Sequence, residues 1–86
     1  GHAQYWIGAS LYTLKQYEAA IVAFDEVVQK YPQDTKVPAA ILKQGFAFAA
    51  LKEKPNARFF LQQVQQKYPD TPEARQATEK LKQLKR

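Results

Sequence analysis

The sequence predicts an all-α protein in which about five antiparallel helices form two stacked hairpins and a closing helix. The first observation is an internal repeat, because Gln-Lys-Tyr-Pro occurs at residues 29–32 and again at 66–69, 37 residues later. The second is helical periodicity, in which apolar residues such as Ala20, Phe24 and Val27 recur every three to four positions. The third is that no stretch alternates strictly between apolar and polar residues, so no strand is expected.

Proline sets most of the predicted helix boundaries. The two Tyr-Pro pairs, at 31–32 and 68–69, end helices, because proline cannot continue a helix and biases the preceding residue toward extended geometry. Pro55 and Pro72 instead suit the first turn of a new helix. The resulting helices are expected at about residues 3–14, 17–30, 36–52, 55–67 and 72–85.

Short polar pairs precede the third and fifth helices. Asp34-Thr35 and Asp70-Thr71 are predicted to supply N-cap oxygens for the first turns of these helices. The fifth helix combines one apolar stripe with charged residues on its other faces, which is typical of a helix that closes a repeat array. Its stripe consists of Ala74, Ala77, Leu81 and Leu84.

Both hairpins carry the same spaced set of residues. The first set is Gln4, Ile7, Gly8, Leu11, Ala20, Phe24 and Pro32, and the second is Ile41, Gln44, Gly45, Phe48, Ala57, Leu61 and Pro69. The small residues let the two helices of a hairpin cross closely, and Phe24 and Leu61 are expected to fill the space beyond. This spacing resembles the tetratricopeptide repeat, from which Gln4 and Gln44 depart. Gln4 is expected at an edge where a missing upstream repeat would have packed.

The repeat pattern predicts how the chain is organised. We expect a single α-solenoid domain over residues 1–86. Its first repeat spans about residues 1–34, its second about 38–71, and a capping helix about 72–85. A hairpin of this kind cannot bury its apolar face alone, so each repeat must pack against the next.

Three segments carry a closer resemblance, to the C-terminal domain of the Tol-Pal system protein YbgF family, also called cell division coordinator CpoB. They are Tyr-Trp-Ile-Gly at 5–8, Lys-Val-Pro-Ala-Ala-Ile-Leu-Lys at 36–43 and Gln-Gln-Val followed by Lys-Tyr-Pro within 62–69. The resemblance implies a periplasmic protein that binds TolA and helps to coordinate peptidoglycan synthesis with outer-membrane constriction during cell division. Family members carry an N-terminal coiled coil. The chain has no heptad segment, so it would correspond to the repeat domain alone.

Two other interpretations stay open for this sequence. The chain is also compatible with the repeat part of another envelope-assembly lipoprotein, because such proteins share parts of the pattern. The other alternative is a homo-oligomerisation module, in which the edge near Trp6 stacks on a second copy.

The family's positional pattern places the first helix of each hairpin along a concave groove. The surface predicted there is aromatic and aliphatic, which suits an extended or helical partner segment with apolar side chains. The predicted groove residues are Tyr5, Trp6, Ala9, Tyr12, Thr13, Leu42, Lys43, Phe46 and Ala49. Tyr5 and Leu42 fit core positions equally well, and Trp6 fits contact with a further repeat.

Two further expectations concern the surface. Phe59, Phe60 and Leu61 are consecutive, so at least one of them should be exposed on the convex side. Relatives that bind a peptide C-terminus use lysine and asparagine side chains in the groove. Only Lys43 is cationic among the equivalent positions, so we expect no recognition of a terminal carboxylate.

Composition argues against several classes of function. The chain has one histidine, one serine and no cysteine, so neither a catalytic triad, a metal site nor a cofactor site is predicted. The net charge of +5 is unevenly distributed. Residues 1–34 carry −2, from two basic and four acidic residues, and residues 35–86 carry +7, from eleven basic and four acidic residues. The basic residues are scattered, which argues against nucleic acid as a partner; they fit solvated helix faces or the steering of an acidic partner. No apolar run is long enough for membrane insertion.

Overall fold

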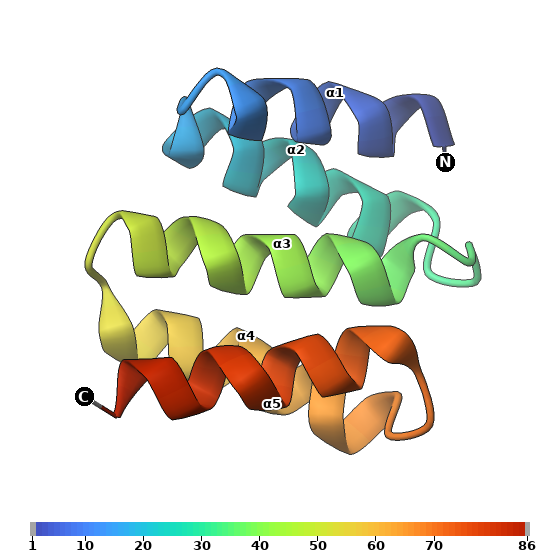
Figure 1. The fold of residues 1–86 in the computed structure, drawn as a ribbon. Coiled ribbons are helices and arrows are strands. Elements are labelled where there is room, and N and C mark those ends of the chain that lie inside the picture. The colour runs from blue at the N-terminus through green and yellow to red at the C-terminus, as the bar shows by residue number, and fades with distance from the viewer. Residues whose placement is uncertain (1, 86) are drawn as a thin grey trace.

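The computed structural model describes residues 2–85 and confirms the predicted all-α array of tandem hairpins (Figure 1). No strand occurs among the described residues. The helices are α1 (His2–Thr13), α2 (Tyr17–Lys30), α3 (Val37–Ala50), α4 (Lys54–Lys67) and α5 (Pro72–Leu84). Each lies within two residues of its predicted bounds.

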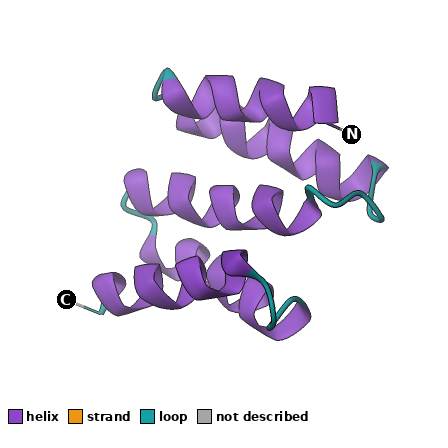
Figure 2. Ribbon diagram, turned by 45° about the vertical axis from the view of Figure 1, so that its right-hand side comes forward, coloured by secondary structure: helices purple, strands orange, loops and turns teal. Residues whose placement is uncertain are grey.

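The five helices form two layers. Helices α1, α3 and α5 lie side by side in one layer, and α2 and α4 lie behind them (Figure 1). Helix α2 packs against both α1 and α3, and α4 packs against both α3 and α5. The array measures 34 × 28 × 16 Å, so its shortest dimension corresponds to two helix layers. Figure 2 shows that short loops close the hairpins, whereas residues 31–36 form a longer connection between them.

The two hairpin turns are built alike. Lys15 and Lys52 both adopt a left-handed backbone, with φ of 63° and 64°. In the first turn the amide of Gln16 donates to the carbonyl of Leu11 at 2.9 Å, and the amide of Glu53 donates to that of Phe48 at the same distance in the second. This is the Schellman ending of a helix. It stops α3 at Ala50, two residues before its predicted end.

Gly8 and Gly45 each mark the contact between the two helices of a hairpin. A Cβ placed on Gly8 would lie 2.7 Å from Cδ1 and Cε1 of Phe24, and one placed on Gly45 would lie 2.8 Å from Cδ2 of Leu61. Phe24 and Leu61 are completely buried. The predicted close crossing is therefore confirmed. The large side chains lie directly against the glycines, however, rather than beyond them.

Two glutamines hold α2 from opposite sides. Nε2 of Gln44 in α3 donates to the carbonyl of Ile21 at 3.2 Å, and Gln44 is buried. Nε2 of Gln4 in α1 donates to the carbonyl of Ala23 at 3.2 Å. The interpretation of Gln4 as a residue left open at an edge is therefore wrong, since its amide bonds inside its own hairpin. Both departures from the repeat pattern thus join adjacent helices.

The two predicted N-caps have different outcomes. The hydroxyl of Thr71 accepts a hydrogen bond from the amide of Ala74 at 3.1 Å, which confirms the cap of α5. The prediction for α3 is wrong, because Lys36 occupies the N-cap position and no side chain caps the helix. Instead Oδ1 of Asp34 accepts from the amide of Lys36 at 2.8 Å and so stabilises the loop.

This difference gives a matched pair of substitutions. Thr71→Ala removes a side-chain cap and is expected to lower the free energy of unfolding by about 1 kcal/mol. Thr35→Ala should leave it nearly unchanged, because Thr35 is exposed and does not cap α3. Urea denaturation of both variants measures the difference. Equal losses would show that the two Asp-Thr pairs play the same part.

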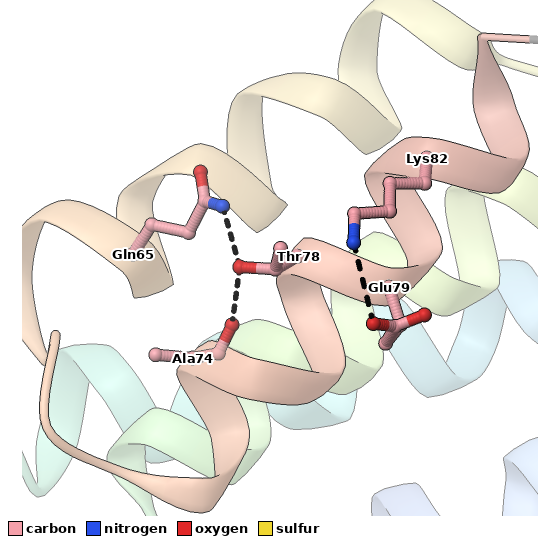
Figure 3. Close-up of polar contacts among 5 residues, drawn as sticks. All are labelled: Gln65, Ala74, Thr78, Glu79 and Lys82. Atoms are coloured by element: carbon pink, nitrogen blue, oxygen red, sulfur yellow. Dashed lines mark hydrogen bonds and ion pairs between the residues drawn. The ribbon is translucent and has the colours of Figure 1, made fainter.

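Helix α5 is fixed to the array by apolar and polar contacts. Ala74 and Ala77 are buried, and Leu81 and Leu84 pack against the core as predicted. Nε2 of Gln65 donates to the hydroxyl of Thr78 at 2.8 Å, and this hydroxyl donates to the carbonyl of Ala74 at 3.0 Å (Figure 3). Because Gln65 belongs to α4, this chain of bonds sets the position of α5 relative to α4.

Candidate partner-binding groove

The layer formed by α1, α3 and α5 contains a hollow where the three helices meet. Its volume is about 350 Å³, and we refer to it as the α1–α3–α5 groove. Its lining residues are Tyr12 from α1, Phe46 from α3, and Gln76, Glu79, Lys80 and Gln83 from α5. The groove therefore joins aromatic surface from the two hairpins to polar side chains of the closing helix.

Two lysines lie over the aromatic part of this groove. Nζ of Lys43 is 5.2 Å from the ring centroid of Tyr12 and 5.6 Å from that of Phe46. Nζ of Lys80 is 5.9 Å from the Phe46 centroid. These distances are those of cation–π pairs. The groove thus places positive charge directly beside exposed ring surface.

A second cation–aromatic cluster lies where α1 approaches the start of α3. Nζ of Lys36 is 5.1 Å from the ring centroid of Tyr5 and 5.4 Å from that of Trp6. The rings of Tyr5 and Trp6 meet edge to face at 5.3 Å. Trp6 remains 57% exposed, so this cluster offers a large aromatic face to solvent.

Two of the predicted groove residues belong to the core. Only 7% of Tyr5 and 2% of Leu42 is exposed, and the ring of Tyr5 packs against that of Phe24 at 5.5 Å. Their assignment to an accessible groove surface is wrong, because both point into the helix interface. The core interpretation, which the sequence left open, is the one that the structure supports.

The remaining predicted residues separate into two surfaces. Tyr12 and Phe46 line the α1–α3–α5 groove, with Lys43 over them. A different open hollow, of about 430 Å³, is formed by α1 and the residue after it; its lining residues are Trp6, Ala9, Ser10, Thr13 and Leu14. Ala49 is half-buried on α3 and lines neither hollow. Their function as partner-binding residues stays a prediction.

The sequence interpretation missed the contribution of α5 to the groove. It treated α5 as a cap, although four of the six lining residues come from this helix. A signal was present in the chain, because Asp-Thr precedes both α3 and α5, at 34–35 and 70–71. This repetition marks α5 as the equivalent of a further first helix, which belongs in the layer of α1 and α3.

The structure confirms that at least one of the consecutive residues Phe59, Phe60 and Leu61 is exposed. Phe59 is 59% exposed, Phe60 is half-buried and Leu61 is completely buried. The ring of Phe60 stacks on that of Phe48 at 5.2 Å. Phe59 therefore offers a large exposed residue on another surface, which is useful as a control for substitutions in the groove.

Two tyrosines with raised pKa values should lower the stability of the fold at alkaline pH. Burial raises the pKa of the Tyr5 hydroxyl above its ordinary value of 10.0, and the charge of Glu73 raises it further. Burial likewise raises the pKa of Tyr12, with a smaller contribution from Tyr17. Since the unfolded chain releases these protons first, the stabilisation present below pH 10 falls as the pH rises through the raised pKa values.

Urea denaturation between neutral and alkaline pH tests this dependence. The free energy of unfolding should fall less at alkaline pH for Tyr5→Phe than for the wild type. An unchanged loss would contradict this cause.

Among residues 2–85, no three His, Cys, Asp or Glu side chains gather in a way that would hold a metal ion. None of the five helices is long and apolar enough to cross a membrane. Every buried side-chain nitrogen or oxygen in this range has a hydrogen-bond partner.

Comparison with known proteins gives one result. The family model described as tetratricopeptide repeat matches residues 2–34 and again residues 39–71. The first match covers α1 and α2, and the second covers α4 and all of α3 except its first two residues. No curated protein matches the chain.

Proposed function

Because the chain belongs to the tetratricopeptide repeat family, we propose that it is a non-enzymatic adaptor that holds a segment of a partner protein in the α1–α3–α5 groove. Repeats of this family are typically scaffolds for protein–protein interaction. The observation that carries the proposal is the aromatic surface of Tyr12 and Phe46, which lies in a hollow bordered by Lys43 and Lys80.

The chemistry of the groove favours a particular kind of partner segment. Tyr12 and Phe46 offer apolar contact, so the segment would place an aliphatic or aromatic side chain between them. The ammonium groups beside the rings would pair with an acidic side chain one helical turn away. An amphipathic helix with apolar anchors at such spacing is a recurring ligand of grooves between helices.

We further propose that the adaptor works in the bacterial periplasm, as a member of the YbgF (CpoB) family. The support is the resemblance of residues 5–8, 36–43 and 62–69 to that family. On this proposal the partner is a segment of TolA. The adaptor then helps to coordinate cell-wall synthesis with outer-membrane constriction during division, with the peptidoglycan synthase machinery as a further partner.

Calorimetric titration tests this function directly. A helical segment derived from TolA is added to the wild-type protein, and a segment of the same composition in scrambled order serves as the control. The proposal expects saturable binding of the first segment and none of the second. Equal heats for both, or none for either, would reject TolA as the partner.

A further inference from the structure

Two cation–aromatic clusters recur at a spacing of seven residues on both α1 and α3. In the Lys36 cluster, Nζ of Lys36 lies 5.1 Å from the ring centroid of Tyr5, and in the Lys43 cluster, Nζ of Lys43 lies 5.2 Å from that of Tyr12. Lys36 and Lys43 are seven residues apart, and so are Tyr5 and Tyr12. The Lys43 cluster therefore reproduces the Lys36 cluster two helical turns further along.

This spacing aligns the two clusters along one seam. Residues seven apart on an α-helix differ by only ~20° in direction, so both lysines lie on one side of α3 and both tyrosines on one side of α1. Lys36 is the N-cap residue, but its backbone is right-handed helical, so it continues the geometry of α3. Helices α1 and α3 run in the same direction within one layer (Figure 1). The clusters thus lie ~10.5 Å apart along the seam between these helices.

The charge of the two lysines is not balanced within the described part of the chain. Both side chains are half-buried, yet no carboxylate of residues 2–85 lies within 4.0 Å of Nζ of Lys36 or Lys43. Glu73, whose charge raises the pKa of Tyr5, does not pair with Lys36. The seam therefore presents two ammonium groups, each held over a ring face, and charge complementarity favours an acidic partner.

On the basis of the groove function proposed above, we propose that the partner is an amphipathic helix that lies along the α1–α3 seam. It carries two acidic side chains seven residues apart, one for each lysine. Residues at this spacing in the partner lie on one face and ~10.5 Å apart, as the lysines do. An extended segment does not match, because side chains on one face of a strand are spaced about 6.7 Å or about 13 Å apart.

Ring surface beside each lysine accommodates an apolar neighbour of each acidic residue. At the Lys43 cluster, this surface comes from Tyr12 and Phe46, which line the groove. At the Lys36 cluster, it comes from Trp6, which is 57% exposed and has its ring centroid 5.4 Å from Nζ of Lys36. An acidic side chain and an apolar one a helical turn away contact each cluster. The partner helix therefore carries the same acidic–apolar pair twice, one heptad apart.

Two synthetic helical peptides of identical composition test the spacing. In the matched peptide, two glutamates lie seven residues apart, each with a leucine one turn away. In the mismatched peptide, the glutamates lie five residues apart and so point to different faces of the helix. Calorimetric titration of the wild-type protein should give a Kd about fivefold lower for the matched peptide.

The other outcomes of this titration separate the spacing from the groove function. Equal Kd values, or a lower Kd for the mismatched peptide, overturn the proposed spacing while the groove function stands. Failure of both peptides to bind overturns the partner class, and titration of the TolA-derived segment then shows whether the groove function fails with it.

Double-mutant cycles test which acidic residue pairs with which lysine. Lys36→Ala and Lys43→Ala are each combined with glutamine in place of either glutamate of the matched peptide. One glutamate should couple to Lys36 and the other to Lys43, each by about threefold in Kd, because only groups in contact depart from additivity. Lys67→Ala removes the same charge from an exposed position in the last turn of α4 and should couple to neither. Coupling of one glutamate to both lysines, or of neither glutamate to either, contradicts the proposed register.

Discussion

Replacing Phe24 with alanine is expected to lower the free energy of unfolding by about 3–5 kcal/mol. The ring is completely buried, and it contacts Gly8 of the facing helix and the ring of Tyr5. Removal of the ring leaves a cavity between α1 and α2 that neither rigid helix can close. Urea denaturation measures the loss. Should the variant fail to fold, Leu61→Ala makes the equivalent change in the second repeat. It removes a smaller buried side chain, so a smaller loss of stability is expected.

The glycine beside this ring should respond in opposite directions in two backgrounds. Alanine is favoured over glycine within a helix by about 1 kcal/mol. In the wild type, however, the added Cβ would lie 2.7 Å from the Phe24 ring, and overpacking of this kind costs about 1–3 kcal/mol. Gly8→Ala should therefore destabilise the wild type but stabilise the Phe24→Ala variant. A stabilising effect in both backgrounds would show that the close crossing does not depend on the glycine.

Phe46→Glu is expected to weaken binding of the partner segment by at least about 2 kcal/mol, which is roughly a 30-fold rise in Kd. Phe46 supplies ring surface to the lining of the α1–α3–α5 groove. Glutamate removes this surface and sets a carboxylate between Lys43 and Lys80, where it would compete with an acidic group of the partner. Because Phe46 is only half-buried, the variant should remain folded.

The matched control for this substitution is Phe59→Glu. It introduces the same charge at an exposed phenylalanine on the convex side, and it should leave the affinity nearly unchanged. Tyr12→Ala removes the other aromatic residue of the groove and should weaken binding to a smaller extent than Phe46→Glu. Calorimetric titration measures the Kd of the partner segment for the three variants. The largest rise in Kd for Phe59→Glu would contradict the groove assignment.

The repeated parts of this fold could be predicted from the sequence for physical reasons. Proline at 32 and 69 cannot continue a helix, and the glycines at 8 and 45 are needed where helices cross. The hairpin turns were harder to predict in detail, because lysine at 15 and 52 occupies the left-handed position that usually takes glycine. The sequence also does not reveal that α3 lacks a side-chain cap, because Asp34 accepts its hydrogen bond from Lys36 within the loop.

The groove could be predicted only in part. Periodicity places Tyr12 and Phe46 on the correct layer, and both line the groove. It cannot decide how deeply a side chain lies between helices, so it leaves Tyr5 and Leu42 open between groove and core, and the structure places both in the core. The contribution of Lys80 depends on where α5 packs, which is a tertiary contact rather than a property of its own sequence.

Chemical-shift mapping by NMR tests the central claim most directly, namely that the partner lies in the α1–α3–α5 groove. The TolA-derived segment is titrated into isotopically labelled protein, and the backbone and side-chain shifts are followed. The account predicts that the largest changes occur at Tyr12, Phe46 and Lys80. Largest changes at Val22 and Phe59 on the convex side, with the groove signals unmoved, would contradict it.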